Sequence, residues 1–116
     1  MLFTLRLKEN KGFMRAFKKG DFVSGNMVTV YFVPNRTPFS RLGISVSKKI
    51  GGAVERNRAK RIIRAAYREC EAMLPIGYDI IFVARAGIIG KKSTDIAQFI
   101  KTKVYRQIDK KSRGNK

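Results

Sequence analysis

Three parts of the chain show the pattern of apolar and polar positions that is typical of β-strands. Residues 27–33 (MVTVYFV) and 41–47 (RLGISVS) alternate at a period of two, whereas residues 78–85 (YDIIFVAR) are almost continuously apolar. Alternation indicates a strand with one buried face, and a continuous run indicates a strand buried on both faces. A shorter segment, residues 21–25, predicts a further strand. The pattern as a whole therefore predicts a four-stranded sheet.

Apolar residues at helical spacing predict one helix near the start of the chain and one near its end. Residues 10–20 place Phe13 and Phe17 four positions apart and end at a glycine, a typical helix stop. The last helix is capped by Ser93 or Asp95. Its apolar residues are spaced by four up to its predicted end: Ile96, Ile100, Val104 and Ile108.

The segment between these strands and helices, residues 47–68 (SKKIGGAVERNRAKRIIRAAYR), predicts a central helix with two different faces. At about 100° per residue, one sector is apolar and points toward the sheet: Ala59, Ile62, Ile63, Ala66, Cys70 and Met73. The opposite sector points outward and contains Asn57 and four cations: Lys60, Arg61, Arg64 and Arg68. Arg56 and Arg58 lie at the edges of this outward stripe.

The elements follow one another as helix, three strands, helix, strand and helix, an αβββαβα order. This order predicts an α+β fold, a two-layer α/β sandwich built on one four-stranded sheet. The strands on either side of the central helix should be parallel, because a crossover joins them. We expect a single domain over residues 1–116, with a frayed basic tail at about residues 110–116.

The charge of the chain points to a polyanionic partner. Lysine and arginine total 26 against 8 acidic residues, which gives a formal net charge of +18. Nucleic acid offsets such self-repulsion through phosphate neutralisation and counterion release. A membrane is the weaker alternative, because no stretch approaches the ~20 apolar residues that span a bilayer. One cysteine, Cys70, and the lack of a signal-peptide pattern predict a cytoplasmic protein.

The cations of the central helix favour a polyanion surface over an ordinary solvated face. A stabilising helix surface mixes charge signs at i, i+4, whereas the pairs Lys60–Arg64 and Arg64–Arg68 repeat one sign. The start of the helix adds partial positive charge and free N–H groups. Lys48 and Lys49 lead into that end of the helix.

The side of the sheet away from the central helix predicts a second nucleic-acid site. Gly43 and Ser45 keep that side of their strand small, and Tyr31 stands in the resulting shallow groove. Phe13 and Phe17 wall the groove from the first helix. Aromatic side chains near cations suit single-stranded nucleic acid, in which stacking contributes ~1–3 kcal/mol per base. The alternative, that Phe13 and Phe17 are core residues that hold the first helix, is equally open at this point.

The chain lacks the residues for cleavage chemistry of its own. It contains no histidine, and its acidic residues form no paired-carboxylate pattern of a two-metal nuclease. Gly51 and Gly52 precede the central helix without the rest of a P-loop. Ser45 and Ser47 have no histidine to activate them. The sequence therefore predicts a binding protein with no catalytic residue and no metal of its own.

One run of residues resembles a known family. Residues 41–64 (RLGISVSKKIGGAVERNRAKRIIR) are closely similar to the signature of the bacterial ribonuclease P protein component. Residues 56–58 correspond to that family's RNR motif, which further cations extend: Lys60, Arg61 and Arg64. The element order, the length and the charge agree with the family, so the resemblance covers the whole chain.

The resemblance implies the protein subunit of a ribonucleoprotein endonuclease that removes the 5′ leader of precursor tRNA. The RNA subunit carries the catalytic site, and Mg²⁺ bound to RNA activates the water. The protein residues implied to bind the catalytic RNA are Lys48, Lys49, Arg56, Asn57, Arg58, Lys60, Arg61, Arg64 and Arg68. Those implied to form the leader-binding cleft are Phe13, Phe17, Tyr31 and Ser45, with Tyr105 as the candidate for a further C-terminal aromatic.

The resemblance also implies a left-handed βαβ crossover, in a fold shared with a domain of a small-ribosomal-subunit protein. No stable protein partner is expected. The alternative function is a general RNA-binding or ribosomal protein that takes no part in cleavage.

Overall fold

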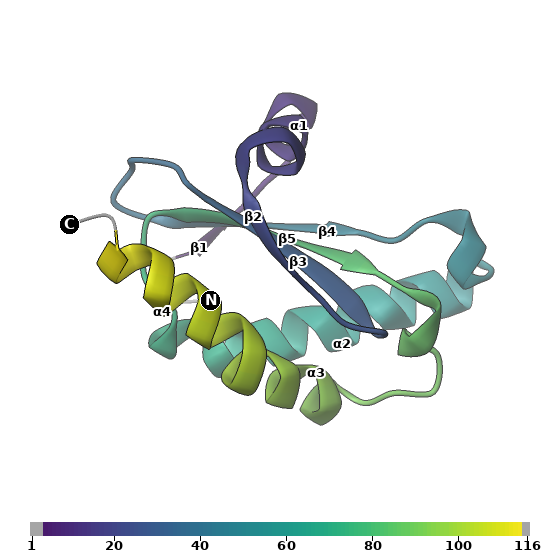
Figure 1. The fold of residues 1–116 in the computed structure, drawn as a ribbon. Helices are drawn as coiled ribbons and strands as arrows, with labels where there is room; N and C mark the ends of the chain where they lie inside the picture. The colour runs from purple at the N-terminus through teal and green to yellow at the C-terminus, as the bar shows by residue number, and fades with distance from the viewer. Residues whose placement is uncertain (1–3, 115–116) are drawn as a thin grey trace.

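The computed structural model describes residues 4–114, which form one five-stranded sheet with helices on both faces (Figure 1). The strands are β1 (Thr4–Arg6), β2 (Asp21–Ser24), β3 (Val28–Pro34), β4 (Ser40–Ser45) and β5 (Tyr78–Ala84). The helices are α1 (Asn10–Lys19), α2 (Ala53–Cys70), α3 (Ser93–Phe99) and α4 (Tyr105–Gly114). A π-helical stretch joins α3 to α4, and 3-10 turns follow β4, α2 and β5: Ile100–Val104, Lys48–Ile50, Glu71–Met73 and Ala86–Ile88.

The α+β class and the element order are confirmed, with one more strand than predicted. The sheet order is β1-β4-β5-β3-β2, and β4 and β5 are parallel neighbours, as the crossover through α2 predicts. The additional strand, β1, pairs in parallel with β4, so that Thr4 lies opposite Ser40. Three residues are too few to show a period of two. This strand forms because the edge of β4 is free to pair with it.

The last helix is longer than predicted. It continues past Ile108 to Gly114 and so includes residues expected to form a frayed tail. The segment has no proline or glycine before Gly114 to end it. Its outer end is also tied to the sheet, because Lys111 Nζ lies 3.4 Å from Asp21 Oδ2.

Most of the apolar core lies between the sheet and the helices α2, α3 and α4, which share one face of the sheet (Figure 1). On α2, Ala59, Ile63, Ala66 and Cys70 are buried as predicted, and Ile62 is half-buried. Met73 is 37% exposed, contrary to the prediction, because the α-helix ends at Cys70 and a 3-10 turn changes the direction of the following residues.

Tyr67 is buried in the core although it lies outside the apolar sector predicted for this helix. Its ring meets Phe82 edge-on at 6.2 Å, and its hydroxyl is 2.9 Å from Thr4 Oγ1. Burial raises the pKa of Tyr67 to about 12. This contact fastens β1 to α2 and explains why so short a strand is held in place.

The other face of the sheet is only partly covered. The helix α1 packs there on a small cluster that contains Leu7, Ala16, Val33 and Ile81. Beyond α1 the sheet stays open, and the α1 side of β5 and β3 carries partly exposed side chains. The open face and the outer surface of α2 are therefore the parts of the fold left for binding.

No helix within residues 4–114 has the length and apolar character needed to cross a bilayer.

Candidate nucleic-acid interface

The outward side of α2 carries the predicted stripe of cations around Asn57. Asn57, Arg61 and Arg68 are exposed, and Lys60 and Arg64 are half-buried at its edge toward the sheet. We call these five residues the α2 stripe. Within the described residues, none of its cations forms an ion pair, since the acidic partners bind lysines and arginines elsewhere. The stripe thus keeps its positive charge available to an external anion.

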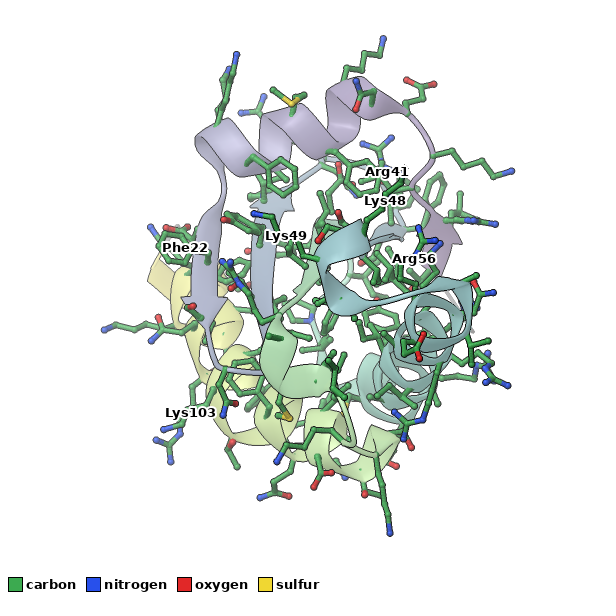
Figure 2. All side chains as sticks on the ribbon, turned by 90° about the vertical axis from the view of Figure 1, so that its right-hand side faces the viewer. Phe22, Arg41, Lys48, Lys49, Arg56 and Lys103 are labelled. Atoms are coloured by element: carbon green, nitrogen blue, oxygen red, sulfur yellow. The ribbon has the colours of Figure 1, made fainter. Side chains whose placement is uncertain are left out.

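The remaining predicted RNA-binding residues flank the stripe. Lys48 and Lys49 are exposed on the 3-10 turn between β4 and α2 (Figure 2). This turn ends at Gly51, whose φ of 147° is rarely adopted by other residues. Arg56 reaches back toward the carbonyl of Gly52, at 3.4 Å. The turn therefore presents two exposed lysines just before the start of α2.

Arg58 has a structural contact that the sequence did not indicate. Its Nη2 donates a hydrogen bond of 2.7 Å to the carbonyl oxygen of Lys91, in the loop before α3. The first turns of α2 are thereby tied to the loop that follows β5. Arg58 holds this loop against α2 and leaves part of its guanidinium for an external ligand.

An aromatic row crosses the open face of the sheet. The ring centroids of Phe13 and Phe17 are 6.4 Å apart, and Phe17 meets Tyr31 edge-on at 4.9 Å. Tyr31 in turn lies 5.6 Å from Phe22, its direct partner across β2 and β3. We call these four residues the aromatic row. Phe17 is 39% exposed, so the row presents ring surface to solvent.

The interpretation as a core residue fits Phe13, and the interpretation as a wall of the groove fits Phe17. Phe13 is half-buried against Ile81 and lies over Gly43, where an added Cβ would be 2.8 Å from the ring. Gly43 is thus the floor on which Phe13 rests. Phe17 reaches beyond this contact into the open groove. Ser45, the next residue on this side of β4, is half-buried opposite Val83.

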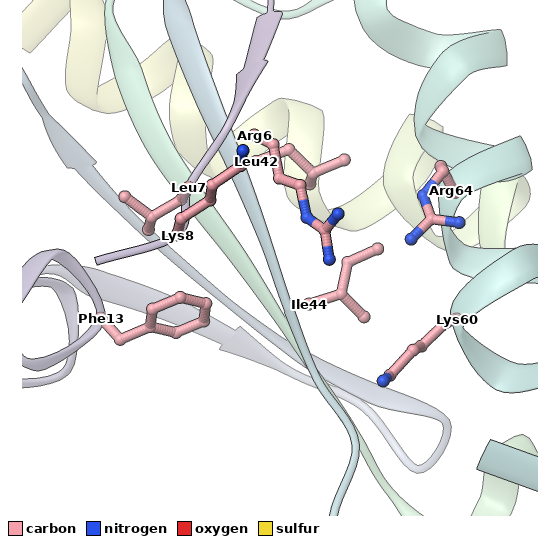
Figure 3. Close-up of a pocket in the computed structure, with 8 residues that line it drawn as sticks. All are labelled: Arg6, Leu7, Lys8, Phe13, Leu42, Ile44, Lys60 and Arg64. Carbon is pink, nitrogen blue, oxygen red and sulfur yellow. The ribbon is translucent and has the colours of Figure 1, made fainter. Parts of the chain in front are cut away.

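A hollow of about 570 Å³ connects the α2 stripe with the aromatic row. Figure 3 shows Arg6, Lys60 and Arg64 extending from β1 and α2 toward the same space, with Phe13 on the opposite side. The hollow lies along β4 where β1 has ended, since β1 pairs only as far as Leu42. The backbone N–H and C=O groups on this unpaired edge can form hydrogen bonds with a ligand, in addition to its contacts with the cations.

Several residues of this surface were missed in the sequence. Arg6 and Lys8 line the hollow because β1 brings them to β4. Arg85 lies at the end of β5, where its Nε donates a 2.9 Å hydrogen bond to Thr29 Oγ1 on the open face. Phe22 falls in the predicted strand 21–25, but only the register with β3 shows which face it occupies.

Tyr105 does not belong to this surface. It packs against the apolar cluster between the sheet and α2, on the opposite side of the sheet from the aromatic row. Its position after the π-helical stretch turns it inward. Tyr105, the candidate for a further C-terminal aromatic of the cleft, therefore lies apart from the aromatic row.

Asp79, a buried carboxylate of the sheet, holds neighbouring side chains in place. Asp79 is fully buried and accepts hydrogen bonds from Arg41 Nε at 2.7 Å and Nη2 at 2.8 Å, and from Asn35 Nδ2 at 2.9 Å. The hydrogen bonds that Arg41 donates to Asp79 raise the pKa of Arg41. Between residues 4 and 114, no three metal-ligating side chains gather in one place. The fold and its two surfaces define an α+β protein that binds nucleic acid.

Comparison with known proteins narrows this class to one family. A family model described as Ribonuclease P matches residues 1–108. The ribonuclease P protein component of Clostridioides difficile is 38% identical over 104 residues, which are 89% of this chain and 91% of that protein. The one from Caldanaerobacter subterraneus is 41% identical over 83 residues, 72% of each chain.

Solved structures agree. The RNase P protein of Staphylococcus aureus superposes with a TM-score of 0.74 and 34% identity, covering 92% of this chain and 94% of that one. The RNase P protein from Thermotoga maritima gives a TM-score of 0.77 and 28% identity over 87% and 96%. The chain belongs to the ribonuclease P protein component family. It is a protein subunit of this endoribonuclease and acts in tRNA processing.

Proposed function

We propose that this subunit binds the catalytic RNA through the α2 stripe and the 5′ leader of precursor tRNA through the aromatic row. The observation that carries the proposal is the hollow beside Phe13, because it joins the two surfaces along the edge of β4. A strand of RNA that leaves the catalytic RNA at Lys60 and Arg64 would reach the row through this hollow. The protein thus holds the leader next to an active site that the RNA provides.

The charge of the stripe supports a backbone contact with structured RNA. Like charges at i, i+4 along α2 repel one another, by about 0.2–0.5 kcal/mol per pair. Phosphate contacts relieve this repulsion and release counterions. Lys48, Lys49, Arg56 and Arg58 extend the same surface at the start of α2.

The aromatic row supports a single-stranded ligand. A duplex keeps its bases stacked inside, whereas a single strand can place each base on a protein ring. Phe17 and Tyr31 offer such rings, and Arg85 and Ser45 lie on the same face to contact phosphate or sugar. The 5′ leader is the single-stranded part of the substrate that this face fits.

The catalytic centre and its Mg²⁺ belong to the RNA subunit in this proposal. The acidic residues of the described chain do not gather into a metal site, so no step of the reaction is assigned to them. The protein residues bind and orient the leader. The proposed location is the cytoplasm, in keeping with the single buried thiol at Cys70.

Reconstitution tests the proposal. Purified protein mixed with precursor tRNA is expected to give no cleavage, whereas addition of the cognate RNA subunit should give efficient leader removal at low Mg²⁺. The matched control is the RNA subunit alone at the same Mg²⁺, which should cleave more slowly. Robust cleavage by the protein alone would refute an RNA-borne active site.

Phe17→Ala tests the aromatic row directly. Loss of one stacking ring is expected to weaken binding of precursor tRNA about fivefold, from ~1 kcal/mol of stacking. Binding of mature tRNA, which has no leader, should be unchanged. Fluorescence titration of the reconstituted enzyme with both RNAs measures this difference.

Phe39→Ala is the matched control for this variant. Phe39 is 37% exposed, close to the 39% of Phe17, but it lies in the loop before β4 and makes no ring contact with the row. It should leave both affinities unchanged. An equal loss on leader-bearing and leaderless tRNA for Phe17→Ala would mean that Phe17 only supports the fold.

A further inference from the structure

Phe22 is the most exposed aromatic side chain within residues 4–114, at 61%. It lies on β2, the edge strand of the sheet, on the same face as Tyr31. An exposed phenylalanine on an edge strand favours self-association unless another molecule covers it. Its position therefore calls for a ligand.

The neighbours of Phe22 show what kind of ligand fits. Its ring is 5.6 Å from that of Tyr31 with an interplanar angle of 38°, so the two rings offer adjoining surfaces. The acidic residue next to it, Asp21, is held by Lys111 at 3.4 Å. Lys18 and Lys19 end α1 just before β2. An aromatic surface with lysines three and four residues before it in the chain suits an RNA base and its phosphate better than an apolar protein partner.

The aromatic row crosses the strands in one direction, and this direction shows where along an RNA strand a base stacked on Phe22 would lie. Phe13 lies over β4, Tyr31 lies on β3, and Phe22 lies on β2, at the opposite edge of the sheet from the hollow. Figure 2 shows Phe22 at one edge of the molecule and Arg56 on the opposite side. RNA that crosses the strands from the hollow thus meets Phe22 last.

We infer that Phe22 forms a further stacking subsite, which binds an unpaired base of the leader at the end farthest from the cleavage site. This inference rests on the proposed function and extends the leader contact by one ring beyond Tyr31. The subsite accepts any base, because every base has a π-face. It makes the affinity for substrate depend on leader length.

The test is a series of precursor tRNAs whose leaders grow by one nucleotide, bound to enzyme reconstituted with Phe22→Ala. For long leaders, Phe22→Ala is expected to bind about fivefold more weakly than the unmodified enzyme, the effect of ~1 kcal/mol of stacking. For leaders too short to reach β2, the two enzymes should bind equally. Phe22→Trp should keep the step in affinity with leader length, and Phe22→Leu, which is apolar without an aromatic face, should lose it.

Phe39→Ala again serves as the control and should retain the step. An equal loss at all leader lengths, or no loss at any length, would overturn the subsite. Sedimentation of the free protein gives a second readout, and a change from dimer to monomer in Phe22→Ala without a change in leader binding would also overturn it. If Phe17→Ala still weakens leader binding while Phe22→Ala does not, only the subsite fails. If both variants bind leaders normally, the proposed function fails with it.

Discussion

Exchange of Arg61 and Arg64 for glutamate is expected to weaken binding to the catalytic RNA about a hundredfold in 0.1 M salt. Each arginine of the α2 stripe is free of ion pairs within the described residues, so each can donate charge-assisted hydrogen bonds to phosphate. Such bonds contribute about 1.5 kcal/mol each, and two lost bonds correspond to roughly 3 kcal/mol. The slope of affinity against salt should fall by up to about one unit per lost contact.

The control for this variant changes the same number of charges elsewhere. Lys103→Glu with Arg106→Glu alters two exposed cations after α3, away from the hollow, and also changes the net charge by four. It should weaken RNA binding only by the general loss of attraction. Filter binding of the RNA subunit across a salt series compares the two variants. Equal losses in affinity and slope would show that the stripe is a solvated surface.

Removal of Arg41 is expected to lower the free energy of unfolding by about 3–5 kcal/mol. Arg41→Ala takes away two hydrogen bonds from the fully buried carboxylate of Asp79 and leaves it with Asn35. A buried charge without its partner is much more costly than the pair itself. For a domain of this size the midpoint of thermal unfolding should fall by roughly 10–20 °C.

A variant in a surface ion pair is the control for Arg41→Ala. Lys101 and Glu69 also lie 2.7 Å apart, but their side chains are 44% and 50% exposed. Lys101→Ala should therefore cost less than about 1 kcal/mol. Calorimetry of both variants in a sulfate buffer, which screens the net charge, measures the difference. Similar shifts for the two variants would contradict the assignment of Asp79 as a buried anchor of β4 and β5.

The helices and most strands could be predicted because their signals are local. The two faces of α2 follow from periodicity alone, and Ala59, Ile63, Ala66 and Cys70 are buried accordingly. The predicted burial of Met73 is wrong because periodicity cannot show where the α-helix ends and a 3-10 turn begins. The RNR motif also lies within one helix, so its residues share one end of α2 without any knowledge of the tertiary structure.

The residues that escaped prediction depend on pairing between distant segments. Phe22 faces the aromatic row only in the observed register, since a shift by one residue would turn it to the other side of the sheet. Arg6 and Lys8 reach the hollow through a three-residue strand held by β4 and Tyr67. Phe13 and Phe17 were ambiguous because a spacing of four fits core and groove equally well. The packing of Phe13 on Gly43 separates them.

Because α1 covers the sheet only partly, the residues that can set specificity differ from those that stabilise the fold. The main apolar core lies on the α2 side, whereas Phe17, Phe22 and Tyr31 rest on the other side and contribute little to it. Substitutions among these side chains can therefore adapt the groove to leaders of different length or sequence while the fold persists. Gly43 is the exception, because a side chain there would displace Phe13. The open face can thus diverge between related subunits while the floor beneath it stays fixed.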